Sequence, residues 1–260
     1  MFIILLPIFN EEKSIDSLFD ALAAYLEAKK YEYKIIACDD GSKDATLAKL
    51  EFYSRKMPVE IIRHKINRGL GETSRDLFER AAEIGRDDDI ILRLDCDCTH
   101  EPQYFEALVN KINEGYDVVT ASRFSKGGNQ KGISRYRAFI SYCATWYMRI
   151  FLPIEGIREY TCGFRAYRAS FIKKAIAFYG NHFIQLMGLG FTCTLEKIVK
   201  LNLLGAKFSE VPFVLRYDKK KSSSKMVSSI TTLGYFVMAV LYHWPSSGWK
   251  AQVRKRLKKA

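Results

Sequence analysis

Leu94-Asp95-Cys96-Asp97-Cys98 is the stretch around which the sequence is organised. The residues before it, 89–94, are mostly apolar and predict a buried β-strand. In an open parallel sheet, ligands bind in the crevice outside the carboxyl ends of the strands. Two carboxylates at that position can bind one hard cation, which takes its other ligands from water and substrate phosphates. Because Asp-x-Asp alone is a weak signal, also compatible with two solvated turn residues, its interpretation depends on the other motifs.

The composition indicates a globular protein with an anionic partner. The 260 residues are long enough for one large α/β domain, and the hydrophobic fraction of 48% is ordinary. The net charge of +12 suggests a phosphate, a nucleic acid or a membrane surface as partner. The basic excess is concentrated late in the chain and no nucleic-acid-binding motif accompanies it, so a nucleic-acid partner is not expected.

The six cysteines do not have the spacing of metal ligands, since Cys96 and Cys98 are only one residue apart. Cys38, Cys96 and Cys98 lie in or beside apolar strands, where cysteine usually acts as a small buried hydrophobe. We therefore expect reduced thiols in a cytosolic protein. Residues 1–7 lack the basic leader and cleavage site of a signal peptide and instead predict a first strand.

Strand and helix patterns alternate along the first 121 residues. Apolar runs predict strands at 2–6, 33–38, 59–64, 89–94 and 117–121. Helical spacing of apolar residues predicts helices at 14–30, at 43–55, in the segment ending at Ile84, and at 103–113. This alternation is typical of an α/β fold with a parallel, doubly wound sheet.

A polar segment follows each of these five strands. The segments are 7–11, 39–42, 67–71, 95–97 and 122–123, and the topology places all of them at one edge of the sheet. This shared location predicts a ligand site more strongly than any single motif. Gly69-x-Gly71 lacks the full glycine fingerprint of dinucleotide-binding proteins, so NAD is not expected.

The second half of the chain has a different pattern. Residues 127–132 are polar and glycine-rich and predict a mobile loop. Residues 133–152 form an aromatic-rich helical stretch with interleaved arginines, which could face either the core or lipid headgroups. Further helices are expected near 170–179 and 191–204, a last strand at 208–215, and a basic loop at 219–225.

The C-terminal segment does not have the pattern of a spanning helix. Its strongly apolar part, 233–244, is about half of the roughly 20 residues that a transmembrane helix needs. Trp249, Val253 and Leu257 share one face of the last helical stretch and are surrounded by basic residues. This pattern predicts an amphipathic helix at a membrane interface, although a solubilising tail has the same composition.

Several motifs occur in order over residues 2 to 226. They are Leu6-Pro7-Ile8-Phe9-Asn10-Glu11-Glu12, Cys38-Asp39-Asp40-Gly41-Ser42-Lys43-Asp44, Asn67-Arg68-Gly69-Leu70-Gly71, Asp95-Cys96-Asp97, Ala121-Ser122-Arg123-Phe124, Thr161-Cys162-Gly163-Phe164-Arg165, Glu210-Val211-Pro212-Phe213 and Ser224-Lys225. This ordered set resembles the family 2 glycosyltransferases with the GT-A fold. Among them it is most similar to polyprenyl-phosphate glycosyltransferases of the dolichol-phosphate mannose synthase type.

The resemblance implies a fold and a division of the chain. The fold would be GT-A, a Rossmann-like and mainly parallel sheet flanked by helices, followed by C-terminal amphipathic helices. Residues 1–226 would form the glycosyltransferase domain, with 1–124 as the nucleotide-sugar half and 125–226 as the acceptor half. Residues 227–260 would be the basic membrane-interface tail.

The resemblance also implies roles for individual residues. The catalytic residues would be Asp97, Arg123 and Arg137, with Asp95 and Asp97 holding Mg²⁺ or Mn²⁺. The acceptor phosphate would be bound by Arg123, Arg137 and Ser141. The nucleotide would be bound by Pro7, Phe9, Glu11, Cys38, Asp40, Asp95, Cys96 and Lys225.

Some positions depart from the family pattern. Thr99 stands where the family often has a glutamine, and Glu159 where many members have an aspartate. The arginine that usually accompanies the residue matching Lys225 is replaced by Lys219 at the expected distance, with Arg216 slightly earlier.

The implied chemistry is a single displacement with inversion at the anomeric carbon. Charge would develop on the β-phosphate of a nucleotide-diphosphate sugar and be stabilised by the metal ion and Lys225. A lipid monophosphate is already ionised near neutral pH, so cationic residues need only position it. Glu196 is a candidate sugar-binding residue or base, and is somewhat better explained as a solvated or capped helix glutamate.

The expected partners are a GDP- or UDP-linked sugar, a polyprenyl phosphate (undecaprenyl or dolichyl), and the cytoplasmic face of a membrane. Docking at the membrane would be peripheral, or would involve a membrane partner subunit or a flippase. Two alternatives stay open: transfer to a hydroxyl of a glycan or lipid-linked saccharide, and a non-catalytic nucleotide-sugar-binding or membrane-scaffold protein.

Overall fold

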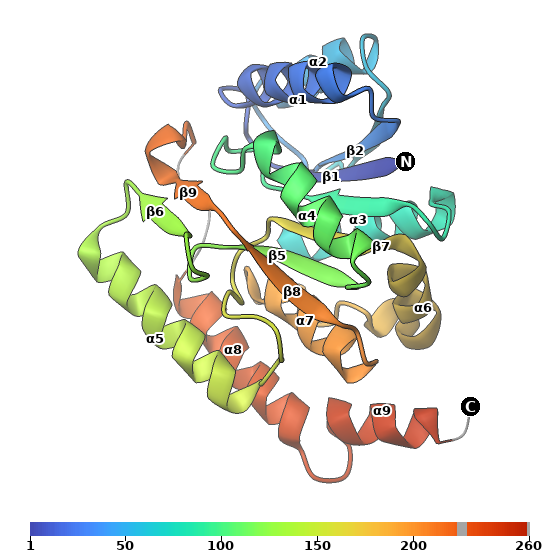
Figure 1. Ribbon diagram of the computed structural model, residues 1–260, viewed down its shortest axis with the longest axis vertical. Coiled ribbons are helices and arrows are strands. Elements are labelled where there is room, and N and C mark those ends of the chain that lie inside the picture. Colours follow the sequence, from blue (N-terminus) through green and yellow to red (C-terminus); the bar gives the residue numbers. More distant parts are fainter. Residues whose placement is uncertain (223–227, 259–260) are drawn as a thin grey trace.

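The computed structural model describes residues 1–222 and 228–258, except for the side chain of Arg137. Its main feature is a seven-stranded sheet with the order β3-β2-β1-β4-β7-β5-β8 (Figure 1). The neighbours among β1 to β4 pair in parallel, as do β5 and β8, whereas β7 is antiparallel to β4 and β5. The strands are β1 (Phe2–Ile8), β2 (Tyr33–Asp39), β3 (Val59–Arg63), β4 (Ile90–Arg93), β5 (Val118–Ser122), β7 (Arg165–Arg168) and β8 (Phe208–Pro212). The α/β, mainly parallel architecture expected from the sequence is confirmed.

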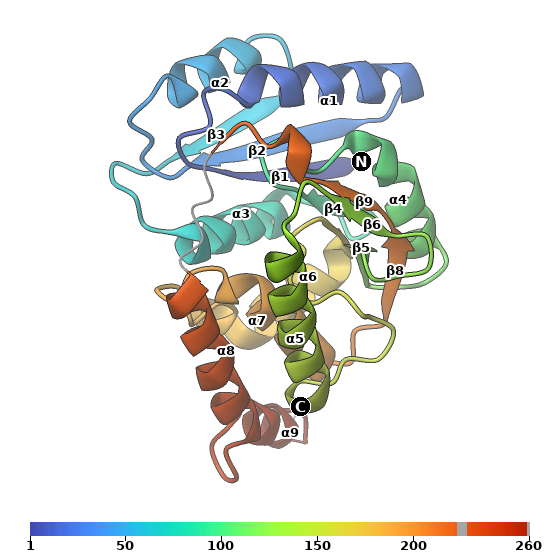
Figure 2. The same cartoon turned by 90° about the vertical axis from the view of Figure 1, so that its left-hand side faces the viewer.

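Helices cover both faces of this sheet, which explains why its strands are apolar on both sides. Alternate residues of β1 enter two different cores: Ile3 and Leu5 in one, Ile4 and Leu6 in the other. The core around Leu6 is closed by α1 (Ile15–Lys29), α2 (Thr46–Ser54) and α4 (Phe105–Asn113). The core around Leu5 is closed by α3 (Leu70–Ile84), α6 (Ala169–Tyr179) and α7 (Thr192–Leu203). Figure 2 shows α1 and α2 on one side of the sheet and α3 on the other.

Three further helices lie beyond α7, away from α1 and α2 (Figures 1 and 2). They are α5 (Arg135–Phe151), α8 (Ser228–His243) and α9 (Trp249–Leu257). The first two lie side by side: the rings of Tyr147 and Phe236 are 5.2 Å apart, and His243 Nε2 lies 2.6 Å from the carbonyl oxygen of Phe151. Short 3₁₀ turns occupy Pro102–Tyr104, Gly180–His182 and Tyr217–Lys219.

The structure corrects three sequence expectations. The single strand expected at 208–215 is two: β8 ends at Pro212, and β9 (Val214–Arg216) pairs with β6 (Asn129–Lys131) in a separate sheet. The break fits proline, which cannot donate a ladder hydrogen bond. The glycine-rich segment expected as a mobile loop therefore contains a strand. Finally, β7 was not predicted, because its four residues are bounded by Arg165 and Arg168 and resemble a polar motif.

The expected interfacial helix at the C-terminus also packs differently. Trp249 and Val253 are 5% and 3% exposed and belong to the core around Leu5, and the ammonium of Lys200 lies 4.4 Å from the Trp249 ring. Only Leu257, of the three apolar residues expected on the interfacial face, is exposed. Within residues 1–222 and 228–258, no helix has the length and hydropathy of a membrane-spanning segment.

Candidate functional site

A cavity of about 950 Å³ lies at the carboxyl ends of the parallel strands. Each of the five polar segments that follow the first five predicted strands contributes to its wall, through Pro7, Asp40, Asn67, Asp95 and Arg123 among others. The prediction that these segments meet at one edge of the sheet is confirmed. The far wall comes from α5, α8 and the start of α7, which the sequence pattern alone did not place there.

One wall of the cavity is organised by Asp40. Its carboxylate accepts hydrogen bonds from the backbone amides of Arg68 and Gly69, both at 2.8 Å, and from the side chain of Asn67 at 2.9 Å. His64 Nδ1 lies 2.7 Å from the same carboxylate. These bonds fasten the loop that begins α3 to the end of β2. Asp40 therefore shapes the wall expected to hold the nucleotide.

Pro7, Phe9 and Glu11 line the same wall, as expected. Glu11 is buried and accepts hydrogen bonds from the hydroxyls of Ser14 and Ser222, both at 2.9 Å. Cys38 differs from this group, because it is buried in β2 and is not among the described residues that line the cavity. Burial raises the pKa of its thiol, so Cys38 stays protonated and serves as packing.

The two aspartates expected at a metal site both reach the cavity, and Cys96 lines it between them. Asp95 Oδ1 lies 2.7 Å from the guanidinium of Arg93, and its backbone amide donates to His100 Nδ1. Asp97 accepts a 2.6 Å hydrogen bond from the hydroxyl of Thr99. Thr99 thus acts as a support for Asp97.

Charged neighbours keep Asp97 ionised. Burial alone would raise its pKa, but the charge of Lys220 and the hydrogen bonds from Lys220 and the Thr99 hydroxyl hold the pKa below its usual range. Lys220 forms a direct ion pair with the Asp97 carboxylate. Among the described residues, no three His, Cys, Asp or Glu side chains cluster as a metal site, so the protein would offer a cation these two carboxylates and leave other positions to substrate and water.

Lys220 belongs to a segment that crosses the cavity edge. Its neighbour Lys219 pairs with Glu101 at 2.5 Å, Lys221 bonds to the hydroxyl of Ser17, and Ser222 donates to Glu11. This basic loop was expected from the sequence, and the family resemblance assigned its functional role to Lys225. Lys225 lies outside the described residues, so its predicted role stays a prediction.

Arg123 forms the acceptor side of the cavity as expected. Its guanidinium makes two bonds to the carboxylate of Glu159, at 2.7 and 3.2 Å, and donates to the hydroxyls of Ser141 and Thr161 at 3.2 and 2.9 Å. Burial would raise the pKa of Glu159, but the Arg123 charge and its hydrogen bonds hold it low. Two of the three residues expected to bind the acceptor phosphate, Arg123 and Ser141, are therefore in direct contact. Arg137 lies in the first turn of α5, but its side chain is outside the described part of the structure.

Glu196 has no access to the cavity in this arrangement. It is fully buried and accepts the backbone amides of Gln185 and Leu186 at 2.8 and 2.9 Å. The ammonium of Lys200 lies 2.5 Å from the same carboxylate. Glu196 thus fixes the segment before α7 and is neither solvated nor placed as a base.

Besides Lys220, two site residues were missed by sequence reasoning. Arg93 lines the cavity from the end of β4, and His100 is buried there, stacked 5.0 Å from the ring of Phe164. Burial lowers the pKa of His100, which favours the neutral imidazole that accepts from the Asp95 amide. A charged residue within an otherwise apolar strand, as in Ile91-Leu92-Arg93-Leu94, was the available signal for Arg93.

Comparison with known proteins extends the similarity over most of the chain. A dolichol-phosphate mannosyltransferase of Pyrococcus furiosus is 30% identical over 211 residues, which are 81% of this chain and 55% of that protein. An undecaprenyl-phosphate 4-deoxy-4-formamido-L-arabinose transferase of Pseudomonas fluorescens is 27% identical over 176 residues, 67% of this chain and 48% of that protein. The chain thus spans about half the length of the curated relatives it matches.

The fold also occurs in solved structures. Glucosyl-3-phosphoglycerate synthase from Mycobacterium tuberculosis, solved with Mn²⁺, uridine diphosphate and phosphoglyceric acid, superposes with a TM-score of 0.61. The sequence identity is 16%, and the match covers 94% of this chain and 78% of that one. The sequence model of glycosyl transferase family 2 matches residues 3–177, which contain Asp95, Asp97 and Arg123. Because this segment is more than half of the 260 residues, the chain belongs to glycosyl transferase family 2.

Proposed function

We propose that this protein is an inverting glycosyltransferase that moves a sugar from a nucleotide-diphosphate sugar to a polyprenyl phosphate at a membrane surface. The observation that supports this most strongly is that one cavity brings the Asp95–Asp97 pair together with the Arg123–Ser141 pair. The first pair suits a diphosphate with its metal ion, and the second suits a phosphate. Two of the relatives are named for transfer to dolichol phosphate and undecaprenyl phosphate.

The donor would lie along the wall formed by Pro7, Phe9 and Asp40, with its diphosphate at Asp95 and Asp97. Carboxylate oxygens suit Mg²⁺ or Mn²⁺, and the M. tuberculosis synthase was solved with each ion beside uridine diphosphate. When bound, such an ion neutralises charge that develops on the β-phosphate. Asp97 is ionised and oriented by Thr99 for this task. The base of the nucleotide, uracil or guanine, is the open choice.

The acceptor phosphate would bind at Arg123 and Ser141, with Arg137 from the same helix as Ser141. One of its oxygens forms the new bond to the anomeric carbon while the bond to the β-phosphate oxygen breaks, and the nucleoside diphosphate leaves with the electron pair. Glu159 fixes the guanidinium of Arg123, so the phosphate meets an oriented donor. No carboxylate base is required, in keeping with the buried ion pair of Glu196.

The surface of α5 and α8 supports a lipid acceptor. Both helices expose large apolar side chains, among them Trp146 at 61% and Phe236 at 55%. The full set is Tyr136, Phe139, Ile140, Tyr142, Trp146, Ile150 and Phe151 on α5, and Ile230, Leu233, Phe236 and Val240 on α8, with Trp244 directly after it. An apolar area of this extent indicates an interaction surface, and the exposed Arg135 and Arg149 on the same helix α5 favour a membrane.

The same two helices line the cavity, through Tyr136, Ile140 and Tyr147 on α5 and Thr231, Tyr235 and Phe236 on α8. A polyprenyl chain lying against this surface would therefore direct its phosphate toward Arg123. We propose peripheral docking of this face, here called the α5/α8 face, on the cytoplasmic side of a membrane.

The test is transfer of labelled sugar from GDP- and UDP-sugars to polyprenyl phosphate in detergent with Mn²⁺, followed by organic extraction. Wild type is compared with Asp97→Asn and with Asp88→Asn, a matched control at an exposed position outside the cavity. An extractable sugar lipid that is lost only in Asp97→Asn supports the proposal. Donor turnover with a glycan but not with the lipid would move the acceptor, and failure of every donor to bind or react would favour a non-catalytic protein.

A further inference from the structure

Three cationic side chains are buried close together near Asp95, on the face of the sheet that α7 covers. Arg93 on β4 and Arg165 on β7 are directly opposite each other in the antiparallel pair, so their side chains leave the same face of the sheet. Lys197 of α7 packs against that face, and its charge interacts with both arginines. Arg93, Arg165 and Lys197 are 3%, 0% and 1% exposed. We call these three residues the buried cation cluster.

The cluster has few negative partners among the described residues. Arg165 donates only to neutral oxygens: the Thr120 hydroxyl and the carbonyls of Thr194 and Tyr160. Arg93 pairs with Asp95, which among the residues that the structure describes is the one carboxylate in an ion pair with the cluster. The nearby carboxylates of Glu159 and Glu196 are already paired with Arg123 and Lys200. The cluster therefore carries an excess of positive charge, which is unfavourable in a buried place unless an anion joins it.

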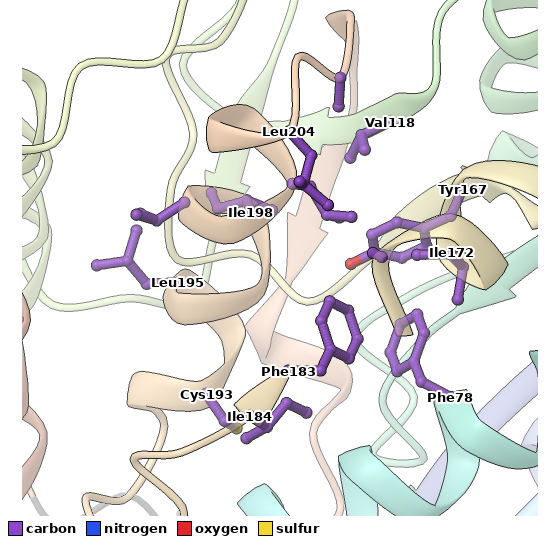
Figure 3. Packing of buried hydrophobic residues seen from close by; sticks show 14 of the residues in the cluster. Phe78, Val118, Tyr167, Ile172, Phe183, Ile184, Cys193, Leu195, Ile198 and Leu204 are labelled. Atoms are coloured by element: carbon purple, nitrogen blue, oxygen red, sulfur yellow. The ribbon is translucent and has the colours of Figure 1, made fainter. Parts of the chain in front are cut away.

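Several polar atoms in this region also lack a hydrogen-bond partner among the described residues. They are Arg93 Nε, Lys197 Nζ and the Tyr167 hydroxyl, all buried. Figure 3 shows Tyr167 and Phe78 beside α7, and the Lys197 ammonium lies 4.7 Å from the Phe78 ring. Unpaired buried polar groups usually indicate a bound ion, a water or a ligand. Because these unpaired groups lie together and two of them belong to cationic side chains, they indicate a binding place for an anion.

Arg93 connects the cluster to the cavity. Its guanidinium lies in the cavity wall next to Asp95 and Gly163. A Cβ atom at position 163 would stand only 1.5 Å from Arg93 Nη1, so the glycine is needed for the guanidinium to take this position. Arg93, Asp97 and Arg123 all line this one cavity. Under the proposed function, the transferred sugar lies in the same cavity, between the diphosphate and the acceptor phosphate.

We propose that Arg93 binds a carboxylate on the transferred sugar, so that the donor is a nucleotide-activated uronic acid. This inference rests on the proposed function and names its substrate class. A guanidinium binds a carboxylate through two parallel, charge-assisted hydrogen bonds, which a neutral hydroxymethyl group cannot reproduce. Arg165 does not touch the sugar, but its charge strengthens the attraction, and Lys197 adds to it when protonated. The diphosphate would have its own partners in Lys220 and in a divalent ion held by Asp97, and so leaves Arg93 to the sugar.

The test compares donors that differ only at C6. Binding of UDP-glucose and UDP-glucuronate, of GDP-mannose and GDP-mannuronate, and of UDP and GDP alone is measured by calorimetry with Mn²⁺ and without acceptor. Wild type is expected to bind the acid of the productive pair at least about tenfold more tightly than the neutral sugar. In Arg93→Met this preference is expected to disappear, and any change in binding of the free nucleoside diphosphate, which can follow from loss of the ion pair with Asp95, should be smaller than the loss in uronate binding. Arg93→Lys should keep part of the preference, because it keeps the charge without the paired donors.

Two controls separate recognition from general damage. Lys220→Met, on the diphosphate side, should weaken both members of a pair and the free diphosphate alike. Lys197→Met, which removes a charge of the cluster away from the cavity, should reduce the acid preference without abolishing it when binding is measured near pH 6, where Lys197 is protonated. Unfolding temperatures of all variants establish that they fold.

Three results overturn the assignment. If wild type binds the neutral sugar as tightly as the acid, Arg93 does not read a carboxylate, although the proposed function stands. If Arg93→Met weakens the free diphosphate as much as the uronate, Arg93 serves the diphosphate instead. If no nucleotide or nucleotide sugar binds at all, both this inference and the proposed function fail.

Discussion

The ammonium of Lys220 forms an ion pair with the carboxylate of Asp97, although the two residues are 123 positions apart in the chain. Arg93 neutralises the other aspartate of the pair, at 2.7 Å from Asp95. Both carboxylates of the Asp95–Asp97 pair thus have cationic partners supplied by the protein itself. A divalent ion must compete with these partners, and a metal–diphosphate complex can offer Lys220 a new anionic partner in exchange.

The first prediction concerns this competition. Replacing Lys220 with methionine removes the cation on Asp97, so Mn²⁺ should bind the nucleotide-free protein more tightly, by about threefold to tenfold. Titration of Mn²⁺ followed by electron paramagnetic resonance measures the affinity directly. Lys219→Met, which removes only the surface pair with Glu101, is the matched control and should leave it unchanged. Equal Mn²⁺ affinities in all three proteins would show that Lys220 does not compete with the metal ion for Asp97.

A second prediction follows from the support of Asp97 by Thr99. Thr99→Val keeps the side-chain shape but removes the 2.6 Å hydrogen bond, so the carboxylate loses part of its orientation and its pKa should rise. We expect kcat of sugar transfer to fall about tenfold, since one hydrogen bond to a charged group is typically worth 1.5–3 kcal/mol. A variant with wild-type kcat and metal dependence would contradict this role.

The buried pair of Arg123 and Glu159 predicts a pH dependence of stability. The pKa of Glu159 is lower in the folded protein than in the unfolded chain, where it is near 4.5. Its stabilising contribution is therefore present above about pH 4.5 and is lost as the pH falls toward the folded pKa. Urea unfolding between pH 7 and 3 should show a steeper loss of unfolding free energy in wild type than in Glu159→Gln. The variant should be less stable at pH 7 by about 3–5 kcal/mol, because Arg123 is left buried without its counter-ion.

Lys197 predicts a second pH dependence of stability, with the same sign as that of Glu159 but at higher pH. Burial lowers its pKa to about 7, below the value of 10.5 in the unfolded chain. Between these values the unfolded chain binds the proton more strongly, so the free energy of unfolding should rise with pH in this range. Relative to Lys197→Met, wild type should gain about 2 kcal/mol between pH 7.5 and 9.5. Parallel curves for the two proteins would mean that the Lys197 ammonium has a partner that keeps it charged.

The α5/α8 face predicts membrane binding through apolar contact. Leu233 and Val240, both exposed on α8, are replaced together by glutamate, and binding to vesicles of anionic phospholipid is measured by sedimentation. Binding should fall at least about tenfold, because apolar surface is replaced by charge at the proposed contact. Phe52→Glu on α2, at the opposite end of the molecule in Figure 1, is the control for an exposed apolar residue and should have little effect. Similar losses in both variants would indicate nonspecific adsorption.

The sequence allowed the first five strands of the main sheet, and the gathering of their polar ends, to be predicted. Buried strands such as β1 are apolar on both faces, so their pattern needs no tertiary information. Asp95, Asp97, Arg123 and Ser141 were found because they follow such strands or match family motifs. The remaining features depend on contacts between distant segments.

Lys220 could not be identified within a run of three lysines, because only the fold shows which one reaches Asp97. Arg93 resembled an interruption of a strand until β7 placed Arg165 opposite it. For Trp249, the helical pattern correctly showed an apolar face, but whether that face meets a membrane or the protein core is decided by α7. Local pattern thus determines the elements, and tertiary contacts determine which face of each element is used.

The most direct test of the proposed activity is made in vesicles that contain a polyprenyl monophosphate, with labelled nucleotide sugar and Mn²⁺ supplied outside. The lipid product is identified by mass spectrometry and its anomeric configuration by nuclear magnetic resonance. The proposal predicts a polyprenyl-phosphate sugar of inverted configuration, formed by wild type and absent with Asp97→Asn. A protein that binds and turns over the donor but never glycosylates the lipid phosphate would contradict it.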